Sequence, residues 1–264
     1  MIETQKTADV RVLDLPIRLD ARPAETRIGL ICLATDHTSE ADFAAILGPL
    51  GGHLHTARIA YANPTNKQNL LKMLPRLQEA ASLILPGEPL DALCYSCTAA
   101  SVVMGDAAVG EAIYAAKPGV PVVTPVSAAR AGFRALGVRR VAVLTPYTEA
   151  VTAELVDYFR AHGLDVADAA CLGLEDDREM ARVDRDSILA AARRVRTDDA
   201  DALFISCTAL RALAVVEAVE EAIGRPVVTS NQASIWYALR AAGVAAAVAG
   251  YGRLLSLPAE RIPA

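Results

Sequence analysis

Eight short stretches of the chain are apolar throughout instead of alternating between apolar and polar residues. They cover residues 27–34, 54–60, 91–96, 120–124, 139–145, 164–171, 201–206 and 226–229. Strands with this pattern have both faces buried, which is typical of a parallel sheet covered by helices on both sides. The pattern therefore predicts parallel strands.

Segments with helical spacing of apolar residues separate many of these strands. They are rich in Ala, Leu, Arg and Glu and cover residues 66–82, 99–116, 149–162, 186–196 and 209–223. Alternation of strands and helices predicts an α/β fold. The charged stretch 175–186 has few apolar residues and predicts an exposed connection.

The order of these elements is given twice. Residues 91–99 read DALCYSCTA and residues 201–209 read DALFISCTA, with seven of nine positions identical. Pro-Val-Val-Thr follows at 121–124 and again at 226–229. This repeat is longer than the repeats of solenoid proteins. It predicts two similar lobes with parallel sheets, related by a pseudo-twofold internal duplication, with an active site between them.

Each copy of the repeat places a thiol at the end of a strand, where a helix is expected to begin. These thiols belong to Cys97 and Cys207. Ligands of open α/β sheets bind beyond the carboxyl ends of the strands. A helix N-terminus stabilises a thiolate, and its free amides, here those of Thr98 and Thr208 and of the alanines that follow, can hold a carboxylate.

Two such thiols can move protons without a cofactor. One, as a thiolate, takes the proton from a carbon next to a carboxylate, and the other returns a proton on the opposite face. The alternative is that both are buried structural cysteines, which are common. Their matched placement favours the catalytic interpretation.

Composition excludes several classes of protein. The formal net charge is −5 with a pI near 5.4, which argues against nucleic acid as a partner. No apolar stretch is long enough to span a membrane, and no signal peptide is recognisable. Five cysteines, an odd number, favour reduced thiols and a cytoplasmic location. Without a phosphate-binding glycine motif, a nucleotide cofactor has no support.

Two local patterns could indicate a redox site or a metal site, but the surrounding sequence argues against both. Cys94 and Cys97 have the spacing of a redox motif, but Cys94 lies within the predicted strand. His53 and His55 lie on one side of a strand, yet no nearby residues complete a metal site. We therefore expect neither disulfide chemistry nor a bound metal.

The paired Ser-Cys-Thr motifs resemble the aspartate/glutamate racemase superfamily. Residues 27–31 (RIGLI) and 144–147 (LTPY) are similar to its branch of maleate cis–trans isomerases and arylmalonate decarboxylases. Residues 33–40 (LATDHTSE), together with 95–101 (YSCTAAS), look most like the ectoine utilization proteins within that branch. The resemblance covers nearly the whole chain from about residue 25.

The resemblance implies roles for individual residues. Cys97 and Cys207 match the two catalytic cysteines, Thr98 and Thr208 match residues that bind a substrate carboxylate, and Tyr147 matches a residue that contacts the substrate. All substrate-site residues expected from sequence and resemblance are Cys97, Thr98, Tyr147, Cys207, Thr208, Asp36, Ser96, Ala99 and Asn231. Of these, Asn231 could equally cap a helix.

Asp36 departs from the pattern of the maleate isomerases, which have Asn there. A negative charge would repel a second substrate carboxylate and would suit a substrate that carries an amine. This fits a diaminobutyrate-type intermediate of ectoine breakdown.

The sequence therefore predicts a cofactor-independent racemase or isomerase acting on a small carboxylate or amino-acid derivative. A maleate-type cis–trans isomerase and a two-lobed carboxylate-binding protein without chemistry remain open, as does a homo-oligomer. The resemblance also implies that the last segment packs back on the first lobe. The expected lobes are residues 1–125 plus 231–264, and 126–230.

Overall fold

Two four-stranded parallel sheets form the centre of the protein in a computed structural model that describes residues 10–257. The strand order is β2-β1-β3-β4 in the first sheet and β6-β5-β7-β8 in the second. Every pair is parallel. The strands are β1 (Thr26–Leu33), β2 (Gly52–Ile59), β3 (Ala92–Ser96), β4 (Val122–Val123), β5 (Arg140–Thr145), β6 (Asp165–Cys171), β7 (Ala202–Ile205) and β8 (Val227–Thr229). The predicted α/β fold with two similar lobes is confirmed.

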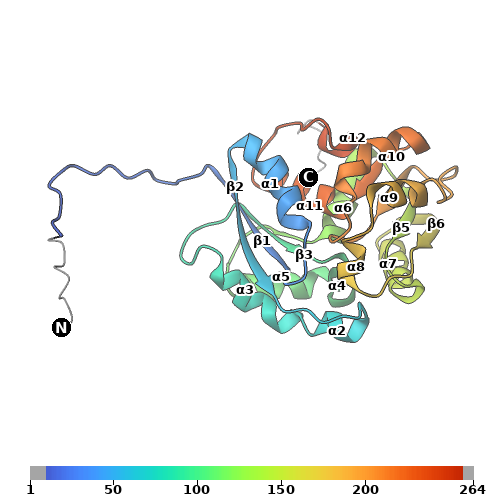
Figure 1. Cartoon of the computed structure of the whole chain (residues 1–264), viewed down its shortest axis with the longest axis horizontal. Coiled ribbons are helices and arrows are strands. Elements are labelled where there is room, and N and C mark those ends of the chain that lie inside the picture. Colours follow the sequence, from blue (N-terminus) through green and yellow to red (C-terminus); the bar gives the residue numbers. More distant parts are fainter. Residues whose placement is uncertain (1–9, 258–264) are drawn as a thin grey trace, which may run out of the picture.

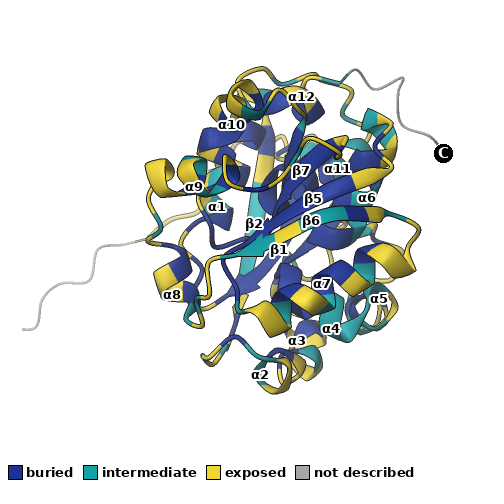
Figure 2. Ribbon diagram, turned by 90° about the vertical axis from the view of Figure 1, so that its right-hand side faces the viewer, coloured by how far each residue is buried: buried dark blue, intermediate teal, exposed yellow. Residues whose placement is uncertain are grey.

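Helices cover the sheets, so the central strands are buried while the outer helix faces are exposed (Figure 2). They are α1 (Ser39–Leu47), α2 (Lys67–Leu71), α3 (Leu77–Leu83), α4 (Thr98–Met104), α5 (Asp106–Tyr114), α6 (Pro125–Leu136), α7 (Glu149–Ala161), α8 (Asp177–Met180), α9 (Arg185–Ala192), α10 (Val216–Ile223), α11 (Ser230–Ala241) and α12 (Gly252–Leu255). Short 3-10 turns occur at Gly48–Leu50, Leu74–Arg76 and Leu213–Val215. No helix within residues 10–257 has the length and apolar character to cross a membrane.

Equivalent helices join the two halves. Each Pro-Val-Val-Thr motif ends in a threonine that caps the next helix: Thr124 accepts from the amide of Ser127, and Thr229 from that of Gln232. The two helices, α6 and α11, pack against each other, and α11 also packs on β3 and α1 of the first half. This packing agrees with the expected return of the chain, while the lobe boundaries themselves stay a prediction.

Three predicted helices are interrupted or shortened. The helix expected over 99–116 is two helices, because Gly105 adopts a φ of 83° that glycine tolerates best. The helix expected over 66–82 is broken at the 3-10 turn containing Pro75, which has no amide to donate. The helix expected over 209–223 begins only at Val216, after a 3-10 turn.

The stretch 175–186 is only partly the exposed connection that its charges predict. It contains α8, in which Asp177 and Met180 are buried at 5% and 0% exposure. These two side chains turn inward, toward the ends of the strands that carry the cysteines.

Candidate functional site

The carboxyl ends of β3 and β7 bring Cys97 and Cys207 to one cavity. Both side chains are buried, at 6% and 7% exposure. The cavity has room for about one water, and all of its lining residues except Tyr61 are buried. The cavity is therefore nearly closed. Its lining comes from both halves of the chain: Leu33, Asp36, Tyr61, Thr65, Leu70, Cys97, Thr98, Ala99, Tyr147, Asp177, Met180, Cys207, Thr208 and Ala209.

Cys97 occupies the position expected from the sequence. It is the N-cap residue of α4, with extended backbone and no side-chain capping hydrogen bond. Burial raises the pKa of Cys97 to about 12, and the Ala100 amide opposes that rise. The amides of Thr98 and Ala99, in the first turn, have no acceptor within the helix and face the cavity region where a carboxylate would bind.

Cys207 differs from its counterpart, and the predicted helix start there is wrong. Its φ is 89°, and the next residues form bends instead of a helix. The thiol itself donates to Met180 Sδ at 3.9 Å, while the amides of Ala209 and Leu210 and the Tyr147 hydroxyl are donors that lower its pKa. Burial raises the pKa of Cys207 to about 11 against these donors. Burial therefore raises the pKa values of both thiols above the ordinary range.

The two threonines contact the opposite half of the chain. The Thr98 hydroxyl donates to Ser230 Oγ at 2.8 Å, and the Thr208 hydroxyl donates to the Ser96 carbonyl at 3.2 Å. Their single donated protons are thus used within the protein. The neighbouring backbone amides are the better donors for a substrate carboxylate.

Ser96 and Asn231 do not line the cavity. The Ser96 hydroxyl lies 2.7 Å from that of Ser39, and Asn231 Nδ2 donates to Asp42 at 2.7 Å and to the Thr208 carbonyl at 3.0 Å. The structure therefore places both residues behind the lining, where they hold it in position.

Asp36 lines the cavity, as expected, and is 5% exposed. Its Oδ1 accepts from the amides of Thr38 and Ser39, both at 2.8 Å, and its Oδ2 accepts from the Ser39 hydroxyl at 2.7 Å. Burial raises the pKa of this carboxyl, although those hydrogen bonds oppose the rise. All of its side-chain partners are uncharged.

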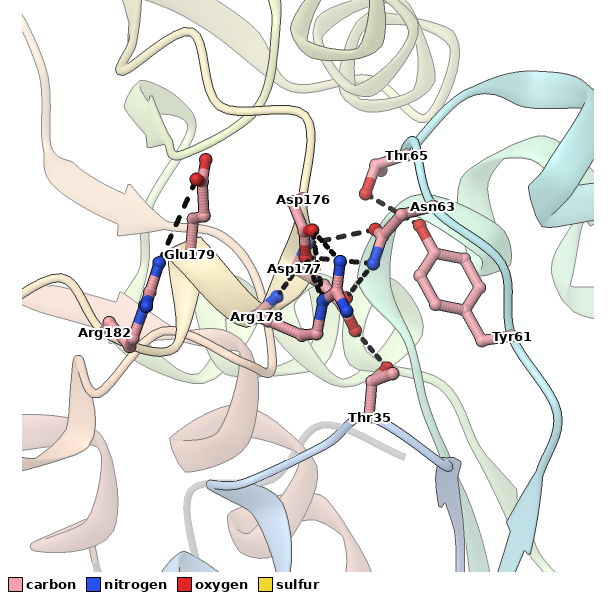
Figure 3. Close-up of polar contacts among 9 residues, drawn as sticks. All are labelled: Thr35, Tyr61, Asn63, Thr65, Asp176, Asp177, Arg178, Glu179 and Arg182. Atoms are coloured by element: carbon pink, nitrogen blue, oxygen red, sulfur yellow. Dashed lines mark hydrogen bonds and ion pairs between the residues drawn. The ribbon is translucent and has the colours of Figure 1, made fainter.

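Asp177 is a second acid in the lining, which the sequence analysis missed. It comes from α8 and is held by the first half: Asn63 Nδ2 donates to its Oδ1 at 2.7 Å, and the Thr35 hydroxyl donates to its Oδ2 (Figure 3). Its amide donates back to Asn63 Oδ1 at 3.1 Å. The signal was its position after β6, since loops at the carboxyl ends of strands share one edge of a sheet.

The charge of the lining is one-sided. It contains Asp36 and Asp177 but no Lys, Arg or His, and neither aspartate forms an ion pair with any residue in 10–257. Within the same residues, no group of His, Cys, Asp or Glu could hold a metal ion. All five cysteines are free, and His53 and His55, with ring centroids 6.3 Å apart, lie on β2.

Comparison with known proteins agrees with this arrangement. The family described as "Arylmalonate decarboxylase" matches residues 91–255, which contain both Ser-Cys-Thr motifs. The chain belongs to the arylmalonate decarboxylase family. The branch indicated by the sequence is thereby confirmed, whereas kinship with the ectoine utilization proteins stays a prediction.

The relatives of this family member include a maleate isomerase and an arylmalonate decarboxylase. A maleate isomerase of Nocardia farcinica is 29% identical over 240 residues, which cover 87% of this chain and 95% of the relative. An arylmalonate decarboxylase of Bordetella bronchiseptica is 38% identical over 139 residues, or 52% and 58% of the two chains. These relatives are enzymes, and this family member is an enzyme as well. The predicted class, isomerase, agrees with the maleate isomerase.

A solved structure shows the same fold. It is a Cys-to-Ser variant of Nocardia farcinica maleate cis–trans isomerase with a covalently bound succinylcysteine intermediate. The TM-score is 0.81 at 27% identity, over 88% of this chain and 98% of the other.

Proposed function

We propose that this family member is a cofactor-independent racemase or isomerase that acts at the carbon next to the carboxylate of an amino-acid derivative. One observation carries the proposal: two thiols share a nearly closed cavity with two buried aspartates and no basic side chain. The substrate must therefore bring whatever positive charge the site contains.

The two thiols divide the proton transfer between them. In this scheme Cys207 removes the proton as a thiolate and becomes a thiol. Cys97 then gives its own proton to the opposite face of the carbon and is left as the thiolate. The amides at the start of α4 bind the carboxylate and stabilise the enolate that forms between the two steps.

The raised thiol pKa values favour a substrate with an ammonium group. A nearby positive charge lowers the pKa of a thiol, and a nearby negative charge raises it. Asp36 and Asp177 both raise the pKa of Cys97, so a dianionic substrate would make ionisation harder still. An amino acid places its ammonium group beside the aspartates and its carboxylate at the amides.

We assign the substrate to the 2,4-diaminobutyrate type found in ectoine breakdown. The motifs around Asp36 and Cys97 support this assignment, as does the acidic lining. Thr98, Thr208 and Tyr147 would contact the substrate, while Ser96 and Asn231 would position that surface from behind.

Maleate cis–trans isomerisation is the second candidate, favoured by the relatives of that name and by the succinylcysteine adduct in one of them. There a thiolate adds to the carbon–carbon double bond, the resulting single bond rotates, and elimination restores the thiolate. The second cysteine supplies the proton that the addition needs and takes it back on elimination.

Deuterium exchange tests the proposal. Both enantiomers of 2,4-diaminobutyrate and of its N-acetyl derivatives are incubated with the enzyme in D2O, and loss of the α-proton is followed by NMR with chiral analysis. We expect exchange and racemisation of one of them, and loss of racemisation in the Cys97→Ser and Cys207→Ser variants. Cys94→Ser, which changes a buried thiol outside the lining, is the matched control. Conversion of maleate to fumarate without any α-exchange would establish the second candidate instead.

A further inference from the structure

The segment Val10–Ala21 leaves the body of the protein as an extended arm (Figure 1). All of its residues are exposed. Six of them are large apolar residues with exposures of 53–97%: Val10, Val12, Leu13, Leu15, Ile17 and Leu19. An exposed apolar set of this size on one segment is typical of an interaction site.

The apolar residues follow a pattern. From Leu13 to Leu19 every second residue is Leu or Ile, and the residues between them are Asp14, Pro16 and Arg18. In an extended chain, alternate side chains point to opposite sides. The stretch Leu13–Leu19 therefore has one continuous apolar edge opposite Asp14, Pro16 and Arg18, which is the pattern of a strand that lies on another surface.

The arm is fixed at its root only. Arg22 forms a two-pronged ion pair with Asp91, with N–O distances of 3.2 and 2.9 Å. Beyond this point, Val10–Ala21 forms no hydrogen bond or ion pair with any other described residue. The root is thus anchored to the first sheet while the apolar edge is left uncovered by its own chain.

We infer that the arm docks on a second copy of this chain. Its two arginines and two aspartates cancel, so it lacks the positive charge that attracts nucleic acid or anionic lipid. An extended chain exposes about 1.45 Å² per dalton, which gives the arm on the order of 2,000 Å². A standard interface buries roughly 1,600 Å².

If two copies exchange their arms, the buried area reaches that of a standard interface. In a two-fold dimer each arm covers the same surface of the other copy. Burying less than half of both arms, together with the surfaces beneath them, exceeds the area of a standard interface. A single arm folded on its own body would gain only half of this, and its anchored root directs it outward (Figure 1).

Light scattering after size-exclusion chromatography tests the inference on the full chain. We expect the mass of a dimer, twice the 27.8 kDa chain, and the mass of a monomer for the combined variant Leu13→Ser, Leu15→Ser, Ile17→Ser and Leu19→Ser. The matched control Asp14→Ser, Arg18→Ser and Asp20→Ser changes the polar edge and should stay dimeric.

The thermal unfolding midpoint of each variant, measured at low concentration, shows that the body remains folded. A monomeric wild type would overturn the inference, and so would an apolar-edge variant that stays dimeric. Loss of the dimer in the polar-edge control alone would show that the other edge of the arm makes the contact, which also contradicts the proposal.

Discussion

Asn63 holds Asp177 by two hydrogen bonds, one in each direction, across a sequence separation of 114 residues. Asn63 follows β2 in the first half, and Asp177 begins α8 in the second. The pair therefore closes the cavity with an acid from one lobe fastened to a loop of the other (Figure 3). The cavity has room for about one water, so we expect such contacts to open when a substrate enters.

Asn63→Ala removes this connection. We expect kcat/KM to fall roughly 10- to 100-fold, because a small misplacement of a positioned group has effects of that size. Amide hydrogen exchange in α8 should become faster. Asn66→Ala is the matched control: Asn66 caps α2, so its loss costs about 1 kcal/mol of stability but should leave α8 exchange unchanged. Equal exchange in wild type and Asn63→Ala would show that the pair does not hold α8.

Asp36→Asn and Asp177→Asn test the origin of substrate charge preference. Each substitution keeps the shape of the side chain and removes a negative charge. We expect kcat/KM for the amino-acid substrate to fall roughly 10- to 100-fold, since a buried charge partner is worth a few kcal/mol. The affinity for dicarboxylates such as maleate should rise, as measured by inhibition. If both ligands respond alike, the acids have only a structural role.

The fold could be predicted because its signals are local and repeated. Apolar strands, helical segments and the two Ser-Cys-Thr blocks recur in one order, and the carboxyl ends of parallel strands share one edge of a sheet. That geometry brings Cys97 and Cys207 to one cavity.

The shape of the site at Cys207 could not be predicted, because the two blocks are nearly identical in sequence. Tertiary contacts decide the difference: the Thr38 hydroxyl donates to the Ala209 carbonyl at 2.7 Å, and the Thr208 hydroxyl reaches Ser96. The role of Asp177 also depends on tertiary contacts. Its partners, Thr35 and Asn63, come from a distant part of the chain.

Both thiols should react with alkylating agents mainly at high pH. Burial raises the pKa of both above the ordinary value, to about 11 for Cys207 and about 12 for Cys97, so both are neutral at pH 7 in the empty enzyme. Alkylation by iodoacetamide, followed by peptide mass spectrometry, should therefore be slow at pH 7 and increase with pH at both positions. Tyr147→Phe removes a hydroxyl that lowers the pKa of Cys207 and should move its alkylation to higher pH, while Tyr61→Phe should not. An unchanged Cys207 profile in Tyr147→Phe would show that this hydroxyl does not lower the pKa of Cys207.

Asp42 should make the protein less stable as the pH rises. Burial raises its pKa to about 7, against the hydrogen bond from Asn231. The folded state therefore binds the proton more tightly than the unfolded chain, whose pKa is near 4. This contribution to stability is fully present below about pH 4 and is lost as the pH rises to 7. Asp42→Asn has no such loss, and its Oδ1 can still accept from Asn231. Urea denaturation measures the difference in free energy of unfolding between this variant and the wild type. We expect that difference to favour the variant by roughly 2 to 4 kcal/mol more at pH 8 than at pH 4. A difference that stays constant between these two pH values would show that Asp42 is ionised in the folded protein throughout.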